Sequence, residues 1–553
     1  MRPSVLARAR ELVGRRRGGV SALITLGAIG FFVTENLRPQ APIDDAFIFY
    51  RYAQNLAAGQ GLVFNAGERV EGFTSVLWTL LIAAGAALGA NIVSFAHWLG
   101  VASGALLLWL TYEYAAFELV REERMVAALA PWLLVMSKPF AVWSTSGLET
   151  PLFAATALAA LIALGRARYG LAVLASVLAV LTRPEGVLIG AVVLGFVLLR
   201  RDVVRRQKVL LVAAYAACLA GLTAFRLRYF GVPLPNTFYA KVGGTMSWWV
   251  HYYLLVYLVH TLLPTLWPSA YAAKKPYFWP GLAWFCVIVV YVAAVGGDAF
   301  GNSRFFLPTL PVSCALAVRG ALEGYRRDTA FGRFAALSLA VSTIWFAFGT
   351  LAGVAALAVA VVESAVSRGW KLRVALGALS SPLLVAAMIR ALSLKPPVLQ
   401  GEVTEHYLVM NALGFSTRRA ELVDARLNWH YTSLLGQYAA QMLAKRPPED
   451  KLVAAVGIGA LGYYSRARIL DMVGLTDPVV ARSKTAPTSS KSYPGHQRAN
   501  ARYVLSRAPD YVMIPPREKA LFTLPALLAL WDDPEFQRRY VFDPELGAYR
   551  RIP

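Results

Sequence analysis

Near its start the chain reads VSALITLGAIGFFVT (residues 20–34), followed at once by ENLRPQAPIDDAFIFYRYAQN (residues 35–55). With its flanks, the first run is long and apolar enough to cross a membrane as a helix. The second segment is polar and aromatic, and it places two adjacent aspartates, Asp44 and Asp45, just beyond that helix. This succession predicts an integral membrane protein with a long polar loop after its first helix.

The composition of the whole chain favours the same class. Of 553 residues, 57% are hydrophobic and 16% are charged, whereas an ordinary soluble domain has about 25% charged residues. A water-soluble enzyme and a disordered protein are therefore excluded. The formal net charge is +23, but the basic residues lie mostly in short breaks between apolar runs. That distribution is typical of cytoplasmic loops rather than of a nucleic-acid-binding face.

Apolar runs of near-spanning length continue from Val20 to Leu394, and they are roughly thirteen in number at about 17–25 residues each. We predict an α-helical polytopic membrane core of about 11–13 helices over residues 1–394. Its basic N-terminus should be cytoplasmic, because positive flanks set the orientation of the first helix. Ser75–Gly89 is apolar but short, and counting it as a span would place later basic joints outside. We therefore expect it to be interfacial or re-entrant.

This topology places five polar joints on the outer face of the cytoplasmic membrane. They are 36–74, 138–150, 182–186, 231–244 and 296–304, the first being the first extracytoplasmic loop. After Leu394 the hydropathy falls, so residues 395–553 are predicted to form a soluble extracytoplasmic α/β domain. Its expected strands are Leu452–Val456, Arg468–Met472 and Tyr511–Ile514.

The first loop contains the strongest candidate for chemistry. Apolar and aromatic residues recur with helical spacing after Pro42, which predicts an amphipathic helix along the membrane surface. Asp44 and Asp45 lie at its N-terminal end, where backbone amides favour carboxylates. They could simply cap the helix. They could also hold a metal or a sugar hydroxyl, or deprotonate an acceptor hydroxyl, a role typically worth about 10²–10⁴ in rate.

Several motifs carry a resemblance to a known class. They are the Asp44–Asp45 pair, FYRYA (49–53), GQGLVFN (59–65), GERVEGFT (67–74), PNTFYAK (235–241), GGD (296–298), RF (304–305), GYY (462–464), Asp471, GL (474–475) and DP (477–478). Together they resemble the GT-C class of membrane glycosyltransferases. Within that class the chain is most similar to the mycobacterial terminal arabinofuranosyltransferase family.

The resemblance implies an inverting transfer, outside the cytoplasmic membrane, of a sugar carried by a polyprenyl phosphate. The acceptor would be a cell-envelope glycan, lipid or protein, and arabinofuranose is the sugar that the nearest family favours. In that family a first-loop acid is the proposed base, a role that passes to Asp44 or Asp45 by position. The expected partners are thus the lipid-linked donor, the acceptor and membrane lipids, without nucleic acid.

Charged and polar residues of the outer joints complete the predicted site. For binding the donor phosphate we name Arg51, Arg183, Lys241 and Arg304, because cations suit a phosphate leaving group. Arg183 could instead form a structural pair with Glu185, and Lys241 could extend to lipid head groups. For sugar or acceptor contacts we name Glu71, Glu149, Asn236, Tyr239 and Asp298. Two acids from distant loops are too little to predict a metal, so no cofactor is predicted and a divalent cation stays an open alternative.

One motif in the C-terminal part points elsewhere. Residues 457–462, GIGALG, match the dinucleotide pattern GxGxxG, with Asp477 downstream. The next expected strand begins at Arg468, which leaves little room for a crossover helix, so we do not predict a nucleotide site.

Two other functional classes compete with the enzyme. A transporter or lipid-linked sugar flippase would also be rich in apolar helices, but we find no pair of matching interrupted halves. A non-catalytic assembly protein would fit if the first-loop acids were only caps. Turnover of a lipid-linked donor distinguishes all three.

Overall fold

The structure is a computed structural model, and its described residues cover most of the predicted core and C-terminal domain. They are 5–117, 119, 123–241, 269, 278–295, 297, 303–326, 418–446, 451–484, 496–519 and 524–552. The predicted domain boundary at 394/395 lies outside them, as does Asp298.

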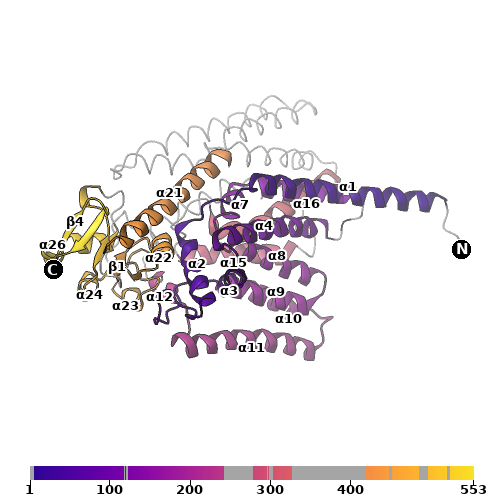
Figure 1. Ribbon diagram of the computed structural model, residues 1–553. Helices are drawn as coiled ribbons and strands as arrows, with labels where there is room; N and C mark the ends of the chain where they lie inside the picture. The colour runs from indigo at the N-terminus through magenta and orange to yellow at the C-terminus, as the bar shows by residue number, and fades with distance from the viewer. Residues whose placement is uncertain are drawn as a thin grey trace, which may run out of the picture.

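Helices dominate the first part of the chain (Figure 1). They are α1 (Val5–Glu35), α2 (Asp44–Ala57), α3 (Val76–Ala87), α4 (Ile92–Ala116), α5 (Arg124–Ala127), α6 (Leu129–Met136), α7 (Lys138–Trp143), α8 (Thr150–Gly165), α9 (Tyr169–Thr182), α10 (Gly186–Leu199), α11 (Arg205–Phe230), α12 (Asn236–Lys241), α15 (Phe278–Val295), the 3₁₀ helix η4 (Arg304–Thr309) and α16 (Leu310–Arg326). The predicted helical class with a C-terminal α/β domain is confirmed.

Among the described residues, four helices are long and apolar enough to cross a membrane: α4, α11, α15 and the continuous η4–α16 segment. Six further apolar helices are shorter. One of these is α3, whose 12 residues correspond to about 18 Å of helix. That length agrees with the expectation that Ser75–Gly89 does not span. The predicted total of 11–13 helices includes apolar runs in 242–277 and 327–394, most of which lie outside the described residues.

Helix α2 differs from the expected surface helix. Its start at Asp44 agrees with the predicted position, but most of its length is buried, including Phe47, Tyr50, Arg51 and Tyr52. The reason is that α3 packs against it from the core while a helix of the C-terminal domain covers its polar side. The helix therefore lies inside the molecule, between the bundle and the C-terminal domain (Figure 1).

The C-terminal part begins with the long helix α21 (Arg418–Ala444) and then forms a five-stranded sheet. Its remaining elements are β1 (Leu452–Ala455), α22 (Gly459–Ser465), β2 (Arg468–Asp471), α23 (Pro478–Ala481), α24 (Ala501–Ser506), β3 (Tyr511–Met513), the 3₁₀ helix η5 (Arg517–Lys519), α25 (Pro525–Trp531), α26 (Pro534–Arg539), β4 (Tyr540–Asp543) and β5 (Ala548–Arg551).

The strand order is β2-β1-β3-β5-β4, with β1 parallel to both β2 and β3 and the other pairs antiparallel. The three predicted strands are confirmed to within one residue. One expectation about this region was wrong. The interval between β1 and β2 does hold a crossover helix, because the seven residues of α22 are enough to connect two neighbouring parallel strands.

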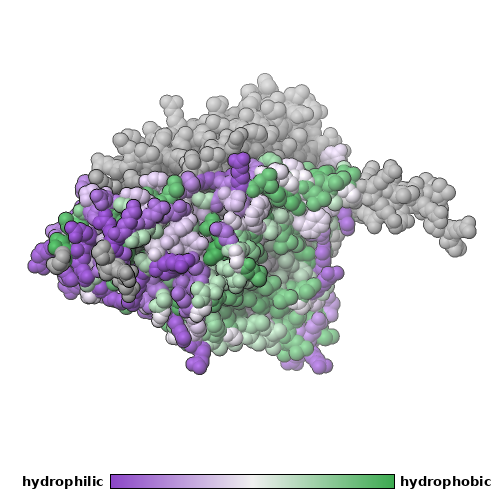
Figure 2. Space-filling view, in the orientation of Figure 1, coloured by the Kyte–Doolittle hydropathy of each residue, from purple (hydrophilic) through white to green (hydrophobic). Residues whose placement is uncertain are grey.

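The sheet and the N-terminus lie at opposite ends of the helical bundle (Figure 1). Figure 2 shows apolar residues gathered over the bundle and polar residues over the C-terminal domain. The first loop and the α11–α12 joint meet this domain directly: Asn65 Nδ2 donates to the Ile469 carbonyl at 2.8 Å, and Asn236 Nδ2 donates to the Gly474 carbonyl at 2.8 Å. Two of the five predicted outer joints, 36–74 and 231–244, thus contact the sheet domain.

Candidate active site

The two first-loop aspartates have different surroundings. Asp44 Oδ2 accepts a hydrogen bond from the Gly459 amide at 3.1 Å, and its Oδ1 accepts one from the Ala460 amide at 2.8 Å. Within the described residues the Asp45 carboxylate takes part in no hydrogen bond or ion pair. Asp44 therefore caps a helix of the C-terminal domain, and Asp45 is the acid whose oxygens remain available.

Burial is the main influence on the Asp44 carboxyl, and it raises the pKa above the ordinary value of 3.8. The Ala460 amide lowers that pKa, and the negative charge of Asp45 raises it again. The negative charge of Asp45 thus disfavours ionisation of Asp44. Asp44 lies at the junction of the two domains, because its carboxylate binds the Gly459 and Ala460 amides.

The contact between Asp44 and α22 explains one glycine of the GIGALG motif, Gly459. A Cβ atom on Gly459 would lie 1.9 Å from the Asp44 carbonyl oxygen, so α2 can approach α22 this closely only where the side chain is absent. The amides at the start of α22, where a dinucleotide motif would hold phosphate, already bind the Asp44 carboxylate.

A second cluster of charged residues lies where the turn between α9 and α10 meets the start of α8. Arg183 precedes Pro184 and takes the extended conformation that proline imposes on its neighbour, with φ −153° and ψ 144°. This turn ends α9 and directs the guanidinium into the protein, where it is buried. There Nη1 donates to Glu149 Oε1 at 2.5 Å, while Nε donates to Glu185 Oε1. Arg183 thus pairs with both acids.

The segment beside this cluster has an unusual set of buried polar atoms. Glu149 Oε2 and the hydroxyl oxygens of Ser144, Thr145 and Thr150 are buried and, within the described part of the chain, have no hydrogen-bond partner. Native proteins rarely leave such groups unpaired, and each instance needs an explanation. Three hydroxyls and one carboxylate oxygen of this kind lie within residues 144–150, beside Arg183.

Arg304 lies next to the same cluster. Its guanidinium carbon is 5.3 Å from the ring centre of Trp143, the residue that precedes Ser144. The guanidinium carbons of Arg304 and Arg183 lie 5.3 Å and 5.2 Å from the ring centre of Phe305. Of the predicted residues, the structure therefore brings together Glu149, Arg183 and Arg304.

Other predicted residues lie where the core meets the C-terminal domain. Both oxygens of Glu71 accept hydrogen bonds from Arg226 of α11, at 2.9 to 3.1 Å, in a buried ion pair. The amide of Asn236 donates to the Glu71 carbonyl at 2.9 Å. The Tyr239 ring stacks under the guanidinium of Arg482, at 4.4 Å. The Tyr239–Arg482 contact joins the two domains, whereas the contacts of Glu71 with Arg226 and Asn236 lie within the first part of the chain.

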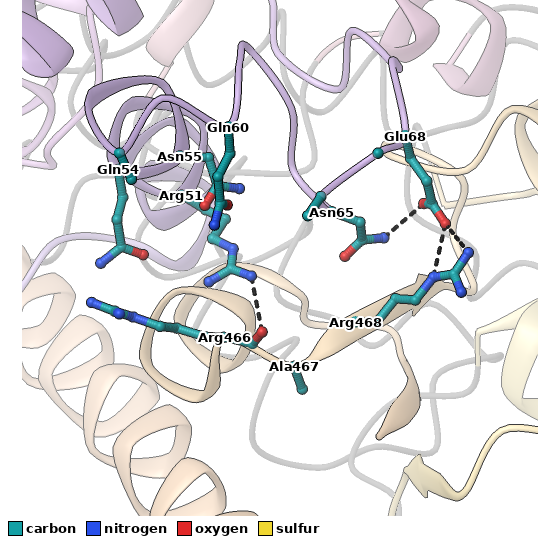
Figure 3. Close-up of a pocket in the computed structure, with 12 residues that line it drawn as sticks. Arg51, Gln54, Asn55, Gln60, Asn65, Glu68, Arg466, Ala467 and Arg468 are labelled. Atoms are coloured by element: carbon teal, nitrogen blue, oxygen red, sulfur yellow. Dashed lines mark hydrogen bonds and ion pairs between the residues drawn. The ribbon is translucent and has the colours of Figure 1, made fainter. Parts of the chain in front are cut away.

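Lys241 is exposed at the end of α12. Arg51 is separate from the Arg183 cluster, because it lines a pocket between the first loop and strand β2 (Figure 3).

Sequence reasoning missed Arg226, although an arginine within a long apolar helix is itself a signal that a buried partner exists. Within the described residues, no group of three or more His, Cys, Asp or Glu side chains is placed to hold a metal ion.

The fold and the site together define a helical, apolar protein whose C-terminal domain packs against the start of the helix that holds the acid pair. Comparison with known proteins shows what this chain is similar to. Over 230 residues, 37% of this chain, it is 31% identical to a terminal β-(1→2)-arabinofuranosyltransferase of Mycobacterium tuberculosis. Over 334 residues it is 28% identical to the enzyme of the same name from Corynebacterium glutamicum. The predicted resemblance to this family is confirmed. The matched segments span 35% and 47% of these relatives.

Residues 426–549 match a family model described as a domain of unknown function, DUF8728. Among solved structures, ArnT from Cupriavidus metallidurans bound to undecaprenyl phosphate aligns with a TM-score of 0.48 at 16% identity, over 82% of this chain and 85% of that one. The oligosaccharyltransferase of Archaeoglobus fulgidus aligns with a TM-score of 0.45 at 12% identity, over 83% and 65% of the two chains.

Proposed function

We propose that this protein is an inverting glycosyltransferase of the cytoplasmic membrane, which moves a sugar from a polyprenyl phosphate to an acceptor on the outer face. The acceptor is a glycan, lipid or protein of the cell envelope. The sequence similarity to two arabinofuranosyltransferases makes arabinofuranose the first sugar to test. The observation that carries the proposal is the division of the acid pair into a capping carboxylate and an available one.

In the proposed reaction Asp45 is the base. Its carboxylate removes the proton of the acceptor hydroxyl as that oxygen bonds to the anomeric carbon of the donor sugar. The bond between the anomeric carbon and the phosphate oxygen breaks at the same time, and the polyprenyl phosphate leaves with the electron pair. Attack from the face opposite the phosphate inverts the anomeric centre, through a transition state of oxocarbenium character. Asp44 holds the base in place by anchoring the start of α2 to α22.

The cluster formed by Arg183, Glu149, Glu185 and Arg304 supplies the proposed donor site. The unpaired oxygens of Glu149, Ser144, Thr145 and Thr150 are suited to sugar hydroxyls. Arg304 provides positive charge for the phosphate, which needs no proton to leave. The charge of Arg183 is balanced by Glu149 and Glu185, so its proposed role is to hold these two carboxylates in place. Lys241, Asn236, Tyr239 and Asp298 remain candidates for contacts with the donor or acceptor. For Glu71, whose two oxygens are bound by Arg226, we propose a structural role.

The test uses the purified full chain with radiolabelled polyprenyl phosphate arabinose and a membrane glycan extract. We expect labelled glycan and released polyprenyl phosphate to appear in equal amounts, and both to require the acceptor. Asp202→Asn, which changes an exposed aspartate of the α10–α11 joint, is the control and should be fully active. Movement of intact lipid-linked sugar across vesicles, without release of lipid phosphate, would instead identify a flippase.

A further inference from the structure

The pocket around Arg51 is a second feature of the α2–α22 contact. The two helices lie side by side. Their starts are joined through Asp44 and Gly459, and the end of α22 is joined to the middle of α2 through Arg51, whose Nη2 donates to the Arg466 carbonyl at 3.0 Å. A pocket of about 550 Å³ opens there, lined by Arg51, Gln54, Asn55, Gln60, Glu68 and Arg466, among others (Figure 3).

Positive charge predominates in this pocket. Arg468 is neutralised by Glu68, since its Nε donates to Glu68 Oε1 at 2.9 Å. Arg51 and Arg466 remain, and within the described residues no acid pairs with either guanidinium. Burial and the neighbouring Arg466 lower the pKa of Arg51 to about 10, so Arg51 is still cationic at neutral pH. Two like charges held this close create a strong attraction for an anion.

The lining also offers unused hydrogen-bonding groups. Gln54 Oε1 is buried and, within the described residues, has no partner. The Gln60 side chain is exposed beside it (Figure 3). The Arg466 guanidinium reaches the pocket from a residue with φ 55°, a backbone conformation that glycine adopts more easily. Amides and arginines together are suited to a ligand that carries both hydroxyl groups and an acidic group.

The pocket wall is formed before any ligand arrives. Asn55 Nδ2 donates to the carbonyls of Val63 and Phe64 at 2.8 and 2.9 Å, and Arg51 Nε donates to the Phe64 carbonyl at 3.2 Å. These bonds fix the first loop against α2. The cost of ordering the loop is therefore already met in the free protein, which favours binding.

We propose that this pocket binds a carboxylate or phosphate group borne by a carbohydrate chain. Arg51 lies six residues after Asp45 on α2, a rise of about 9 Å. An acidic acceptor glycan held here would thus be anchored a short distance from its reacting hydroxyl. The identification of the ligand as the acceptor rests on the proposed function, whereas the binding itself does not.

The experiment measures binding to the purified full chain without any donor. The probes are trigalacturonate, its neutral methyl ester and glucose 6-phosphate, which separate a carboxylate from a phosphate and both from a neutral sugar. Arg466→Gln should weaken binding of the preferred anionic probe by about tenfold, the value expected for one charge-assisted hydrogen bond. Arg502→Gln, at an exposed arginine of α24, should leave it unchanged. Rising salt should weaken binding as well.

Tighter binding of trigalacturonate than of its methyl ester and glucose 6-phosphate identifies a carboxylate as the ligand. Tighter binding of glucose 6-phosphate identifies a phosphate. Either result supports the proposal when Arg466→Gln abolishes the difference in affinity. Equal binding of the methyl ester, or anion binding that is insensitive to Arg466→Gln, would overturn it. The same titration with Asp45→Asn should give wild-type affinity. If the wild-type chain binds the anionic probe but transfers no sugar from a lipid-linked donor, the proposed function is contradicted and the binding proposal is not.

Discussion

The carboxylate of Asp44 and the backbone amide of Gly459, 415 positions apart in the chain, are joined by a hydrogen bond of 3.1 Å. This bond and its neighbour at Ala460 attach the first loop to the C-terminal domain at the point where the proposed base begins α2. The C-terminal domain is therefore in direct contact with the proposed active site. Changes in α22 should affect the reaction although α22 supplies no base.

Gly459→Ala should weaken the contact between the domains. The new Cβ would lie 1.9 Å from the Asp44 carbonyl oxygen, and overpacking of this kind costs about 1–3 kcal/mol. We expect a lower midpoint of thermal unfolding and faster proteolysis of the C-terminal domain. Gly457→Ala is the matched control, because its Cβ would meet Asp44 Oδ2 at an ordinary 3.8 Å. Equal behaviour of the two variants would show that the close approach at Gly459 is not required.

Ser144→Ala and Thr150→Val, which remove the hydroxyl groups, test the proposed donor site. Both hydroxyls are buried and unpaired within the described residues, so removing them should change the free energy of unfolding by no more than about 0.5 kcal/mol. If they bind sugar hydroxyls, KM for the lipid-linked donor should rise by about tenfold. Unfolding curves and steady-state kinetics measure the two effects. Unchanged kinetics in both variants would exclude this segment from the donor site.

Glu71→Gln should act through stability. It leaves Arg226 as a buried charge without its carboxylate partner, a loss of about 3–5 kcal/mol. Replacing both residues, in Glu71→Gln with Arg226→Met, should recover much of that loss, since no charge is then left unpaired. The measurement is denaturant unfolding of the single and double variants. A stable single variant that has lost only transfer would point instead to direct contact with the substrate.

Asp471 should make the stability depend on pH. Burial raises its pKa to about 6, against an ordinary 3.8, while the amides of Thr476, Val473 and Gly474 oppose the change. The folded protein then binds the proton more tightly than the unfolded chain. The contribution of Asp471 to the free energy of unfolding is therefore largest below about pH 4 and declines by about 3 kcal/mol as the pH rises to about 6. Melting curves across this range should show a flatter dependence in Asp471→Asn, and equal slopes would contradict the assignment.

Much of the fold follows from local sequence. The apolar runs of β1, β2 and β3 predicted strands to within one residue, because buried parallel strands are short and uniformly apolar. Strands β4 and β5 were missed, since YVFD and AYRR mix charged and aromatic residues. Of the two, β4 is the edge strand and β5 lies between β3 and β4. The crossover helix α22 was not predicted, because the interval between the first expected strand and Arg468 is short.

The partners of the site residues could not be predicted in the same way. Nothing near Asp44 indicates that its carboxylate binds amides from the far end of the chain, and Glu71 and Arg226 are 155 positions apart. The sequence did favour a pair of acids after the first helix, but not which one would be left available. That distinction comes from the packing of α22 on α2.

The most direct test of the proposed mechanism compares Asp45→Asn with Asp44→Asn, measuring release of polyprenyl phosphate and the midpoint of thermal unfolding of each. For Asp45→Asn we predict an unchanged midpoint and a rate lower by about 10²–10⁴, the usual value of a positioned base. For Asp44→Asn we predict a lower midpoint, because the amides of Gly459 and Ala460 lose their carboxylate. A wild-type rate in folded Asp45→Asn would contradict the assignment of this residue as the base.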